Sequence, residues 1–342
     1  MPKIFVTRPI PEMGIKMLRD KGYEVLINEA AKERAATLDE LKDGARGADA
    51  ILSVLTDKIT AEVMDAGLPM LKIVANFAVG YDNIDLGAAK QKNIMVTNTP
   101  GVLTETVAEH TFALMIAIAH RIAEADRFAR AGKFTAWGPE LLLGTDLCHK
   151  TIGIIGLGRI GSRVALHAAK GFGMKVLYYD PNPNPDFEKE FGAVYVANID
   201  ELLPQCDFVS IHVPLLYPVK SSEAGTPKEL FDRVNSTYHL INEERLKKMK
   251  PSAYLINTSR GPVVDEKALA QALKSGVIKG AALDVFEFEP EITPELKELD
   301  NVVLTPHIAS ATIGTRSRMA ELAANNIIEA LEGRTPPNLV VK

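Results

Sequence analysis

Three runs in the second half of the chain end in side chains that can bind a carboxylate and move a proton. Each is a short apolar run followed by polar residues: 253–257 leads to Arg260, 281–283 to Asp284 and Glu289, and 302–304 to His307. The planar fork of an arginine grips a carboxylate through two hydrogen bonds. A histidine, with an ordinary pKa of about 6.5, donates or accepts a proton near neutral pH, and a neighbouring carboxylate raises that pKa. These residue types fit proton transfer on a small keto or hydroxy acid.

Each of these residues alone has a simpler explanation. An arginine after a strand is more often a solvated strand end, and a single histidine is more often structural. The carboxyl ends of parallel strands, however, lie along one edge of an open α/β sheet, where such sheets bind ligands. Arg260, Glu289 and His307 follow successive strand candidates, after a nucleotide-binding motif. Their arrangement therefore favours one shared site.

The nucleotide motif is the run from Gly156 to Gly161, which matches G-x-G-x-x-G. It follows the apolar run 152–155 and opens a helix predicted over 159–169, which is the context that the motif requires. Gly156 permits a tight turn, Gly158 lets the backbone approach a pyrophosphate, and Gly161 lets the helix pack closely on the strand. The helix N-terminus would face the phosphates. A glycine turn without a ligand is the alternative.

The nature of the nucleotide depends on Asp180, which ends the next strand candidate, 175–179, and lies 19 residues after Gly161. A carboxylate there accepts hydrogen bonds from ribose hydroxyls and repels a 2′-phosphate. The stretch from Pro181 to Glu188 contains no lysine or arginine to hold such a phosphate. The sequence therefore favours NAD over NADP.

The elements that position these groups begin with an α/β series in the first hundred residues. Short β-rich runs alternate there with amphipathic helical stretches, a pattern typical of a parallel sheet covered on both faces. The strand candidates are Ile4–Thr7, Val25–Asn28, Ala50–Leu55, Lys72–Asn76 and Ile94–Asn98. The helix candidates are Pro11–Lys21, Thr37–Ala45, Thr60–Ala66 and Leu86–Lys92.

A long helix is predicted from Thr104 to Ala131, with an apolar stripe too broad for a helix on a free surface. Burial within the chain and a subunit interface explain that stripe equally well. An irregular stretch over 134–146 precedes a second α/β series, and one long helix is expected over 311–330. The strand candidates of the second series are Thr151–Ile155, Lys175–Tyr179, Ala193–Val196, Phe208–His212, Ala253–Asn257, Ala281–Val285 and Val302–Thr305.

Length and composition indicate a two-domain chain and disfavour nucleic-acid-binding and membrane-spanning proteins. The 342 residues suggest about two domains. With 39 basic and 44 acidic side chains the formal charge is −5, which disfavours a nucleic-acid binder. The longest central apolar run, Phe112 to Ala119, is too short to span a membrane. Cys148 and Cys206 form neither a disulfide framework nor a metal motif, which favours a reducing cytoplasm.

The motifs together resemble the D-isomer-specific 2-hydroxyacid dehydrogenases, and among them most closely the glyoxylate/hydroxypyruvate reductases. The resemblance is nearly end to end. It rests on the glycine turn with Asp180, and on the runs Asn76–Asp85, Thr97–Pro100, Asn257–Gly261, Leu283–Pro290 and Thr305–His307.

The resemblance implies roles for the strand-end residues. Arg260 would bind the substrate carboxylate and keto oxygen, His307 would donate the proton in reduction, and Glu289 would be its carboxylate partner. The family motif places that acid five residues after the aspartate, which selects Glu289 over Glu287 and Glu291. Backbone N–H groups near Val79 and Gly80 would hold the carboxylate, with Leu55 as a pocket wall.

The same resemblance implies a nicotinamide cofactor and no metal. Asp284 would accept from the nicotinamide carboxamide, Thr104 would lie near the ring, and His212 and Pro214 would border the adenosine. The full expected cofactor set is Thr104, Gly156, Gly158, Arg159, Ile160, Gly161, Asp180, His212, Val213, Pro214, Thr258, Ser259, Arg260, Asp284, His307 and Ala309. Apart from His307, the histidine side chains are expected to be structural: His110, His120, His149, His167, His212 and His239.

Two further expectations concern the surface. The resemblance implies a homodimer formed through the helix and loop 104–146, where Trp137 would reach toward the partner's active site. Between Leu215 and Thr237 there are 21 residues, about 18 more than the family pattern has. A tolerated surface loop with a short helix at 228–234 explains this insertion, and a cover over the adenosine pocket or an added oligomer contact is the alternative.

The expected fold is α/β, with two doubly wound parallel-sheet domains. A Rossmann NAD domain, 102–310, would be inserted into a flavodoxin-like substrate domain, 1–101 plus 311–342. The expected reaction is NADH-dependent reduction of glyoxylate or hydroxypyruvate. Two alternatives remain open: a related dehydrogenase of 3-phosphoglycerate, D-lactate or 2-ketogluconate, and an NAD-sensing corepressor or scaffold of the same fold.

Overall fold

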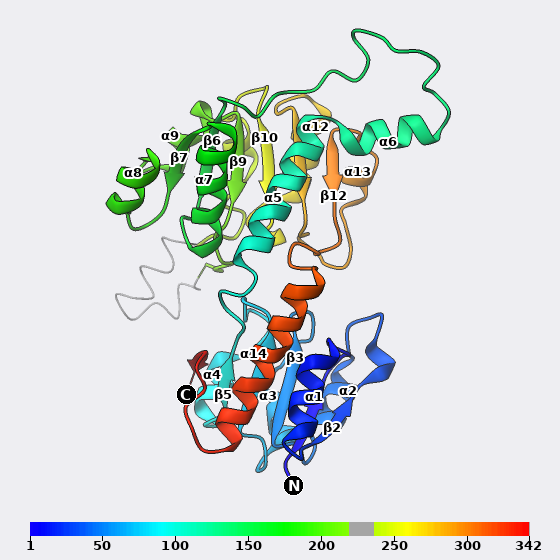
Figure 1. Ribbon diagram of the computed structural model, residues 1–342, viewed down its shortest axis with the longest axis vertical. Coiled ribbons are helices and arrows are strands. Elements are labelled where there is room, and N and C mark those ends of the chain that lie inside the picture. Colours follow the sequence, from blue (N-terminus) through cyan, green and yellow to red (C-terminus); the bar gives the residue numbers. More distant parts are fainter. Residues whose placement is uncertain (219–235, 342) are drawn as a thin grey trace. The chain divides into compact units, whose positions relative to one another are not determined.

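The chain folds into two α/β units in the computed structural model, which describes residues 1–218 and 236–341 (Figure 1). The first unit comprises Met1–Leu103 with Ser310–Lys342, and the second is Thr104–Ala309. The second unit is thus one continuous segment bounded on both sides by the first. The helix expected at 228–234 lies outside the described residues.

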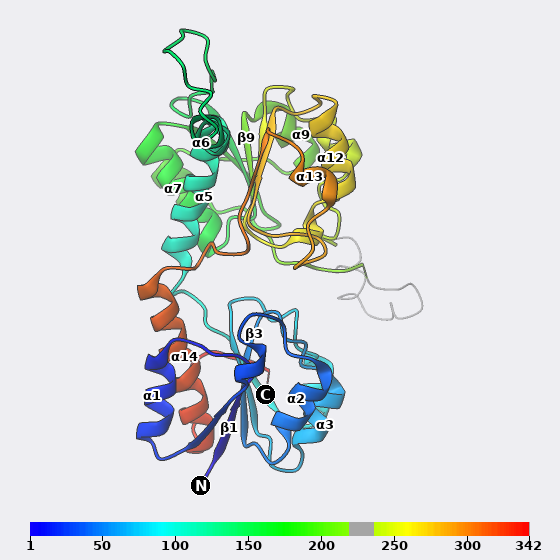
Figure 2. The same ribbon diagram turned by 90° about the vertical axis from the view of Figure 1, so that its right-hand side faces the viewer.

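The first unit is built on a six-stranded sheet. Its five parallel strands follow a doubly wound order, and helices cover both faces (Figure 2). The order is β13 (Leu339–Val341), β5 (Met95–Thr97), β4 (Ile73–Phe77), β3 (Ala50–Val54), β1 (Lys3–Val6), β2 (Glu24–Ile27). α1 (Glu12–Asp20) and α14 (Ile313–Leu331) cover one face, and α2 (Leu38–Ala45) and α3 (Ala61–Gly67) the other; α4 (Leu86–Gln91) precedes β5.

The edge strand β13 is a feature that sequence periodicity does not predict. It pairs antiparallel with β5, whereas the other strand pairs of this sheet are parallel. Its three residues, Leu339–Val341, are too few to show a strand period of two. The five strands that the sequence predicts in the first hundred residues are parallel as expected, and β13 adds an antiparallel edge strand that the sequence does not predict.

The second unit is built on a seven-stranded, all-parallel sheet. Its order is β12 (Val302–Leu304), β11 (Gly280–Leu283), β10 (Tyr254–Asn257), β9 (Phe208–Ile211), β6 (Thr151–Ile155), β7 (Lys175–Tyr179), β8 (Val194–Tyr195). Strands β9, β10 and β11 are buried along their whole length, as expected for strands covered on both faces, whereas only the first residue of β12 is buried. The chain reverses its direction of winding between β6 and β9, which makes the carboxyl ends of these two strands the switch point of the sheet.

Helices cover both faces of this second sheet (Figure 2). On one face lie α5 (Thr104–Ala119) and α7 (Arg159–Phe172). On the other lie α9 (Ile199–Leu202), α12 (Glu266–Lys274) and α13 (Pro294–Lys297). The remaining helices α8 (Pro185–Phe191) and α11 (Glu243–Leu246) lie in strand connections. Among the described residues, no helix is long and apolar enough to cross a membrane.

The prediction of one helix from Thr104 to Ala131 is wrong, because the helix is interrupted at Arg121. Arg121 has a left-handed φ of 55°, which ends α5 and starts α6 (Ile122–Arg130) in a new direction. Its guanidinium then bonds both carboxylate oxygens of Glu124 at 2.7 Å, which fixes the turn. The apolar stripe of α5 is buried in the unit, whereas α6 and the following loop project away from the body of the unit (Figure 1).

Candidate active site

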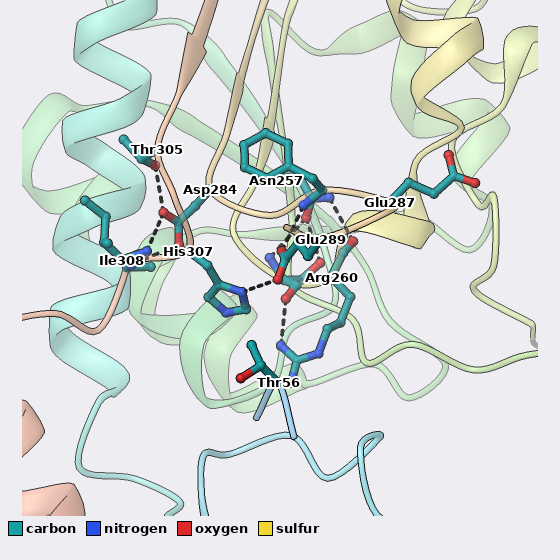
Figure 3. A network of polar contacts seen from close by, with 12 residues as sticks. Thr56, Asn257, Arg260, Asp284, Glu287, Glu289, Thr305, His307 and Ile308 are labelled. Atoms are coloured by element: carbon teal, nitrogen blue, oxygen red, sulfur yellow. Dashed lines mark hydrogen bonds and ion pairs between the residues drawn. The ribbon is translucent and has the colours of Figure 1, made fainter. Parts of the chain in front are cut away.

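The three strand ends that the sequence singled out are neighbours in the second unit. Strands β10, β11 and β12 lie side by side, and their carboxyl ends present Arg260, Glu289 and His307 respectively (Figure 3). The parallel register explains this, since Asn257 is level with Leu283, and Leu283 with Leu304. Residues up to 50 positions apart in the chain therefore share one edge of the sheet.

His307 and Glu289 form the central pair of the site. Nδ1 of His307 lies 2.9 Å from Oε2 of Glu289, and Oε1 of Glu289 accepts from the N–H of Phe286 at 2.9 Å. The two side chains are 25% and 24% exposed, so water or a small molecule can reach them. With Nδ1 bound to the carboxylate, Nε2 is the nitrogen of His307 that can exchange a proton.

The position of His307 depends on Asp284, at the end of β11. His307 has a left-handed φ of 52°, unusual for a residue with a side chain. Its N–H donates to the carbonyl of Asp284 at 2.8 Å, and the Asp284 carboxylate accepts from the N–H groups of Ile308 and Ala309 at 2.8 Å. Asp284 therefore fixes the turn on which His307 lies.

Asp284 remains charged although its side chain is fully buried. Burial raises its pKa, but hydrogen bonds from His110, from Thr305 and from the N–H groups of Ile308 and Ala309 outweigh that effect and hold the pKa below its usual range. The hydroxyl of Thr305 donates to Oδ1 at 2.7 Å, and Nε2 of His110 lies 3.4 Å from the same oxygen.

His110 belongs to this network, although sequence reasoning left it among the structural histidines. Its Nε2 lies 3.2 Å from the Thr305 hydroxyl. It reaches the strand end because α5 packs across β10, β11 and β12. The next residue of α5, Thr111, bonds Thr258 hydroxyl to hydroxyl at 3.0 Å. Helix periodicity indicates which face of α5 is apolar, but it carries no signal for these polar contacts.

Arg260 lies on a short loop that Asn257 stabilises. The Asn257 amide donates to the carbonyl of Arg260 at 2.9 Å, and its oxygen accepts from both the N–H and the hydroxyl of Ser259. Nη1 of Arg260 donates to the carbonyl of Ser259 at 2.8 Å. These contacts hold the loop that carries the guanidinium at the end of β10 (Figure 3).

The glycine turn has the geometry that its motif requires. Gly156 has a φ of +95°, and a Cβ there would lie 2.8 Å from the His212 carbonyl oxygen. A Cβ at Gly161 would lie 2.0 Å from the carbonyl oxygen of Gly156, whereas one at Gly158 would point into open space. That open space lies at the N-terminus of α7 and fits the approach of a pyrophosphate, so the residues present suit a dinucleotide.

Asp180 lies beside this turn, at the end of β7. Its Oδ2 accepts from the N–H of Leu157 at 2.9 Å, and its Oδ1 accepts from the N–H of Asn182 at 3.0 Å. The carboxylate is therefore fixed next to the loop that would hold the pyrophosphate, where a ribose would follow. Arg159 and Ile160 form the first turn of α7.

His212 follows β9 on the other side of the switch point. Its Nε2 lies 2.8 Å from the Ser210 hydroxyl, and burial lowers the pKa of its imidazole to about 3. Val213 and Pro214 come next, and the carbonyl of Pro214 accepts from the Thr237 hydroxyl at 2.6 Å. The N–H of Thr237 donates to Leu216, so the chain segments on either side of the inserted residues meet.

Leu55, Val79 and Gly80 lie in the first unit, after the neighbouring strands β3 and β4. Leu55 follows β3 and is half-buried. After β4, the carbonyls of Ala78 and Val79 accept from the Thr99 N–H and the Asn98 amide, both at 2.8 Å. The N–H groups of Val79 and Gly80 point the opposite way, because a trans peptide sets its N–H against its C=O. Thr104 is the first residue of α5.

Comparison with known proteins identifies the family. The D-isomer specific 2-hydroxyacid dehydrogenase family (catalytic domain) matches residues 4–341. A glyoxylate reductase of Korarchaeum cryptofilum is 50% identical over 343 residues, covering 99% of this chain and 96% of that protein.

Two solved structures share the fold. An NADPH-dependent glyoxylate/hydroxypyruvate reductase of Sinorhizobium meliloti, in complex with NADP and malonate, superposes with a TM-score of 0.80 at 32% identity, covering 99% of this chain and 96% of that one. A D-lactate dehydrogenase of Aquifex aeolicus, complexed with NAD and lactic acid, gives 0.80 at 33% identity and 99% coverage of both chains. The predicted family and fold class are confirmed: this chain is an enzyme of the D-isomer specific 2-hydroxyacid dehydrogenase family, whose members use a nicotinamide cofactor.

Proposed function

We propose that the protein reduces small 2-keto acids, glyoxylate and hydroxypyruvate, to glycolate and D-glycerate with NADH. The observation that carries the proposal is the His307–Glu289 pair, 2.9 Å apart, at a strand end adjacent to that of Arg260. Under this proposal the second unit binds the nucleotide and carries the acid/base pair. The glyoxylate reductase relative at 50% identity supports this choice among keto acids.

In the proposed mechanism His307 holds a proton on Nε2, directed toward the keto oxygen. The Glu289 carboxylate bonds Nδ1 and orients the imidazole, so that Nε2 faces the substrate. Arg260 binds the substrate carboxylate and polarises the carbonyl, so that negative charge developing on the oxygen meets a fixed cation. When bound, the reduced nicotinamide supplies the hydride.

Substrate selection is proposed to involve the N–H groups of Val79 and Gly80, which fit a carboxylate, and the apolar side chain of Leu55. The adjoining residues Phe77 and Ala78 carry no positive charge. A phosphorylated acid such as 3-phosphoglycerate would need additional cations at this position. The glyoxylate reductase relative supports a short, unphosphorylated 2-keto acid.

The cofactor is proposed to be NADH rather than NADPH. Asp180 is fixed beside the glycine turn by the N–H groups of Leu157 and Asn182. A carboxylate in this position accepts from the ribose hydroxyls and repels a 2′-phosphate. The other proposed contacts are those expected from the family: Thr104, Arg159, Ile160, His212, Val213, Pro214, Thr258, Ser259, Asp284 and Ala309.

A second copy of the chain is the proposed partner. None of the residues of α6 is buried, and α6 projects from its unit together with the loop that follows (Figure 1). Large apolar side chains on this segment are exposed: Ile122, Phe134, Trp137 and Leu143, with Trp137 at 80%. Such a surface is typical of a subunit interface. The exposed thiol of Cys148 fits the proposed cytoplasmic location.

The direct test of the substrate and cofactor is NADH oxidation by the purified protein. The panel contains glyoxylate, hydroxypyruvate, pyruvate, 2-ketogluconate and 3-phosphohydroxypyruvate, each with NADH and with NADPH. The proposal expects the highest kcat/KM with glyoxylate or hydroxypyruvate and NADH. A higher kcat/KM with pyruvate or a phosphorylated acid would contradict the substrate assignment, and a preference for NADPH would contradict the cofactor assignment.

A further inference from the structure

We infer that Glu266 is a positioning residue for the acid/base pair, a buried carboxylate that holds the loop carrying Glu289. The inference rests on the proposed function, in that Glu289 is taken as the partner of a catalytic His307. Glu266 is the first residue of α12 and is 1% exposed. A buried carboxylate is costly unless hydrogen bonds compensate it, so its contacts indicate what it stabilises.

Those contacts lie on the two ends of one loop. Oε1 of Glu266 accepts from the N–H of Glu287 at 2.6 Å. Oε2 accepts from the N–H of Thr293 at 3.3 Å and from its hydroxyl at 2.5 Å. One side chain therefore joins both ends of the segment 287–293, which carries Glu289.

The segment between these two ends is a tight turn. The N–H of Glu291 donates to the carbonyl of Phe288 at 2.9 Å, and Glu289 lies within that turn. A displacement of either end would therefore move the Glu289 carboxylate as a unit with the turn. The distance from Oε2 of Glu289 to Nδ1 of His307 is the quantity that such a displacement would change.

A second carboxylate reinforces the attachment. Oε2 of Glu287 accepts from the N–H of Glu266 at 3.2 Å, so each of the two residues accepts the backbone N–H of the other. The other carboxylate oxygen of Glu287, Oε1, lies 2.7 Å from Nε2 of His239, which gives it a hydrogen-bond partner. The start of α12 and the Glu289 loop are thus tied by reciprocal hydrogen bonds.

The loop that carries Glu289 also packs against the loop that carries Arg260. A Cβ at Gly261 would lie 1.9 Å from the carbonyl oxygen of Phe286, so the two loops are in backbone contact and only glycine fits. Phe286 in turn donates its N–H to Glu289. Glu266 therefore also fixes Glu289 relative to the loop that carries Arg260.

A simpler role for Glu266 would be to complement the dipole of its own helix. The contacts argue against this, because the N-terminus of α12 is capped by Asp265, which accepts from Ala268 at 3.0 Å. The Glu266 carboxylate bonds the N–H of Glu287 and both the N–H and the hydroxyl of Thr293. A role in placing the segment 287–293 accounts for these bonds.

The test is a double-mutant cycle between Glu266 and Glu289. E266Q and E266A are made in the wild type and in E289Q, with K267Q as the control because Lys267 is the exposed neighbour on the same helix. For each variant, kcat and KM for glyoxylate with NADH are measured, together with the NADH Kd from fluorescence and the thermal midpoint. E266Q keeps one acceptor oxygen and a side chain of similar size, so it still tests the inference if E266A does not fold.

The inference expects E266A to lower kcat about 10- to 100-fold, with E266Q intermediate and the NADH Kd within about twofold of wild type. In the E289Q background the same substitutions should lower kcat less than about threefold, because a residue that acts through Glu289 has nothing left to position. K267Q should retain wild-type kcat in both backgrounds.

Two outcomes would overturn the inference while leaving the proposed function intact: folded E266Q and E266A with wild-type kcat, or the same fall in kcat with and without Glu289. A wild-type kcat for E289Q itself would instead contradict the proposed acid/base pair. If E266A does not fold, E266Q decides between these outcomes.

Discussion

Nδ1 of His307 lies 2.9 Å from Oε2 of Glu289, on loops that follow adjacent strands of the second sheet. Under the proposed mechanism this contact determines that Nε2 of His307 faces the substrate, because the carboxylate orients the imidazole through Nδ1. The left-handed backbone of His307 is held in turn by Asp284. The reactive geometry thus follows from buried hydrogen bonds rather than from the histidine alone.

Arg260 is expected to need its forked guanidinium and not merely its charge. Arg260→Lys keeps one positive charge but loses the two parallel hydrogen bonds to a carboxylate. We expect kcat/KM for glyoxylate to fall on the order of 100-fold, with KM raised, and Arg260→Ala to be worse. Steady-state kinetics with saturating NADH measure this. Arg334→Lys, at an exposed ion pair, is the control, and unchanged kinetics for Arg260→Lys would refute the role.

Asp180 is expected to set the cofactor preference. Asp180→Ser removes the charge that would repel a 2′-phosphate. The ratio of kcat/KM with NADH to kcat/KM with NADPH should therefore fall at least about tenfold. Asp186→Ser, at an exposed acid a few residues away, should leave the ratio unchanged. An unaltered ratio in Asp180→Ser would show that another group selects the cofactor.

The buried imidazole of His212 is expected to destabilise the fold in acid. Its folded pKa of about 3 lies below the ordinary value, so the unfolded chain binds the proton first and stability falls as the pH drops from about 6.5 towards 3. Between pH 7 and pH 5 this one group should cost about 2 kcal/mol.

The measurement compares urea unfolding at the two pH values in the wild type and in His212→Asn. The loss of stability between pH 7 and pH 5 should be smaller in this variant, by about 2 kcal/mol. His120→Asn, at an exposed histidine, should behave as the wild type does. Equal losses in the wild type and His212→Asn would mean that the folded imidazole titrates normally.

The exposed apolar side chains of α6 and its loop are expected to be buried in a dimer. Ile122→Glu should place a charge in that interface and weaken the dimer. The mass measured by sedimentation equilibrium should then shift toward the 37.2 kDa of one chain. Leu38→Glu, which changes an exposed leucine of α2, should remain dimeric. A monomeric wild-type protein would contradict the proposed partner.

The glycine turn and the strand-end residues could be predicted from sequence because local rules determine them. Gly156 and Gly161 leave no room for a side chain, and Arg260 and His307 directly follow strong apolar runs. A parallel sheet then brings such positions to one edge without further information. The family motif also selected Glu289, and the ring of His307 bonds this acid.

Other features depend on contacts between distant residues and could not be predicted. The break at Arg121 rests on one left-handed residue and its bond to Glu124, and β13 forms only because β5 offers an edge. No sequence motif marks His110 or Glu266 as part of the site. They join the site through the packing of α5 and through the return of the Glu289 loop to α12.

The most direct test of the account is the kcat for glyoxylate reduction in His307→Gln, measured with NADH and accompanied by the NADH Kd. Glutamine keeps a polar side chain of similar size but cannot donate the proton as an imidazolium does. The account predicts a fall in kcat of at least about 100-fold, with the Kd for NADH within about twofold of wild type. A kcat within twofold of wild type would contradict the assignment of His307 as the proton donor.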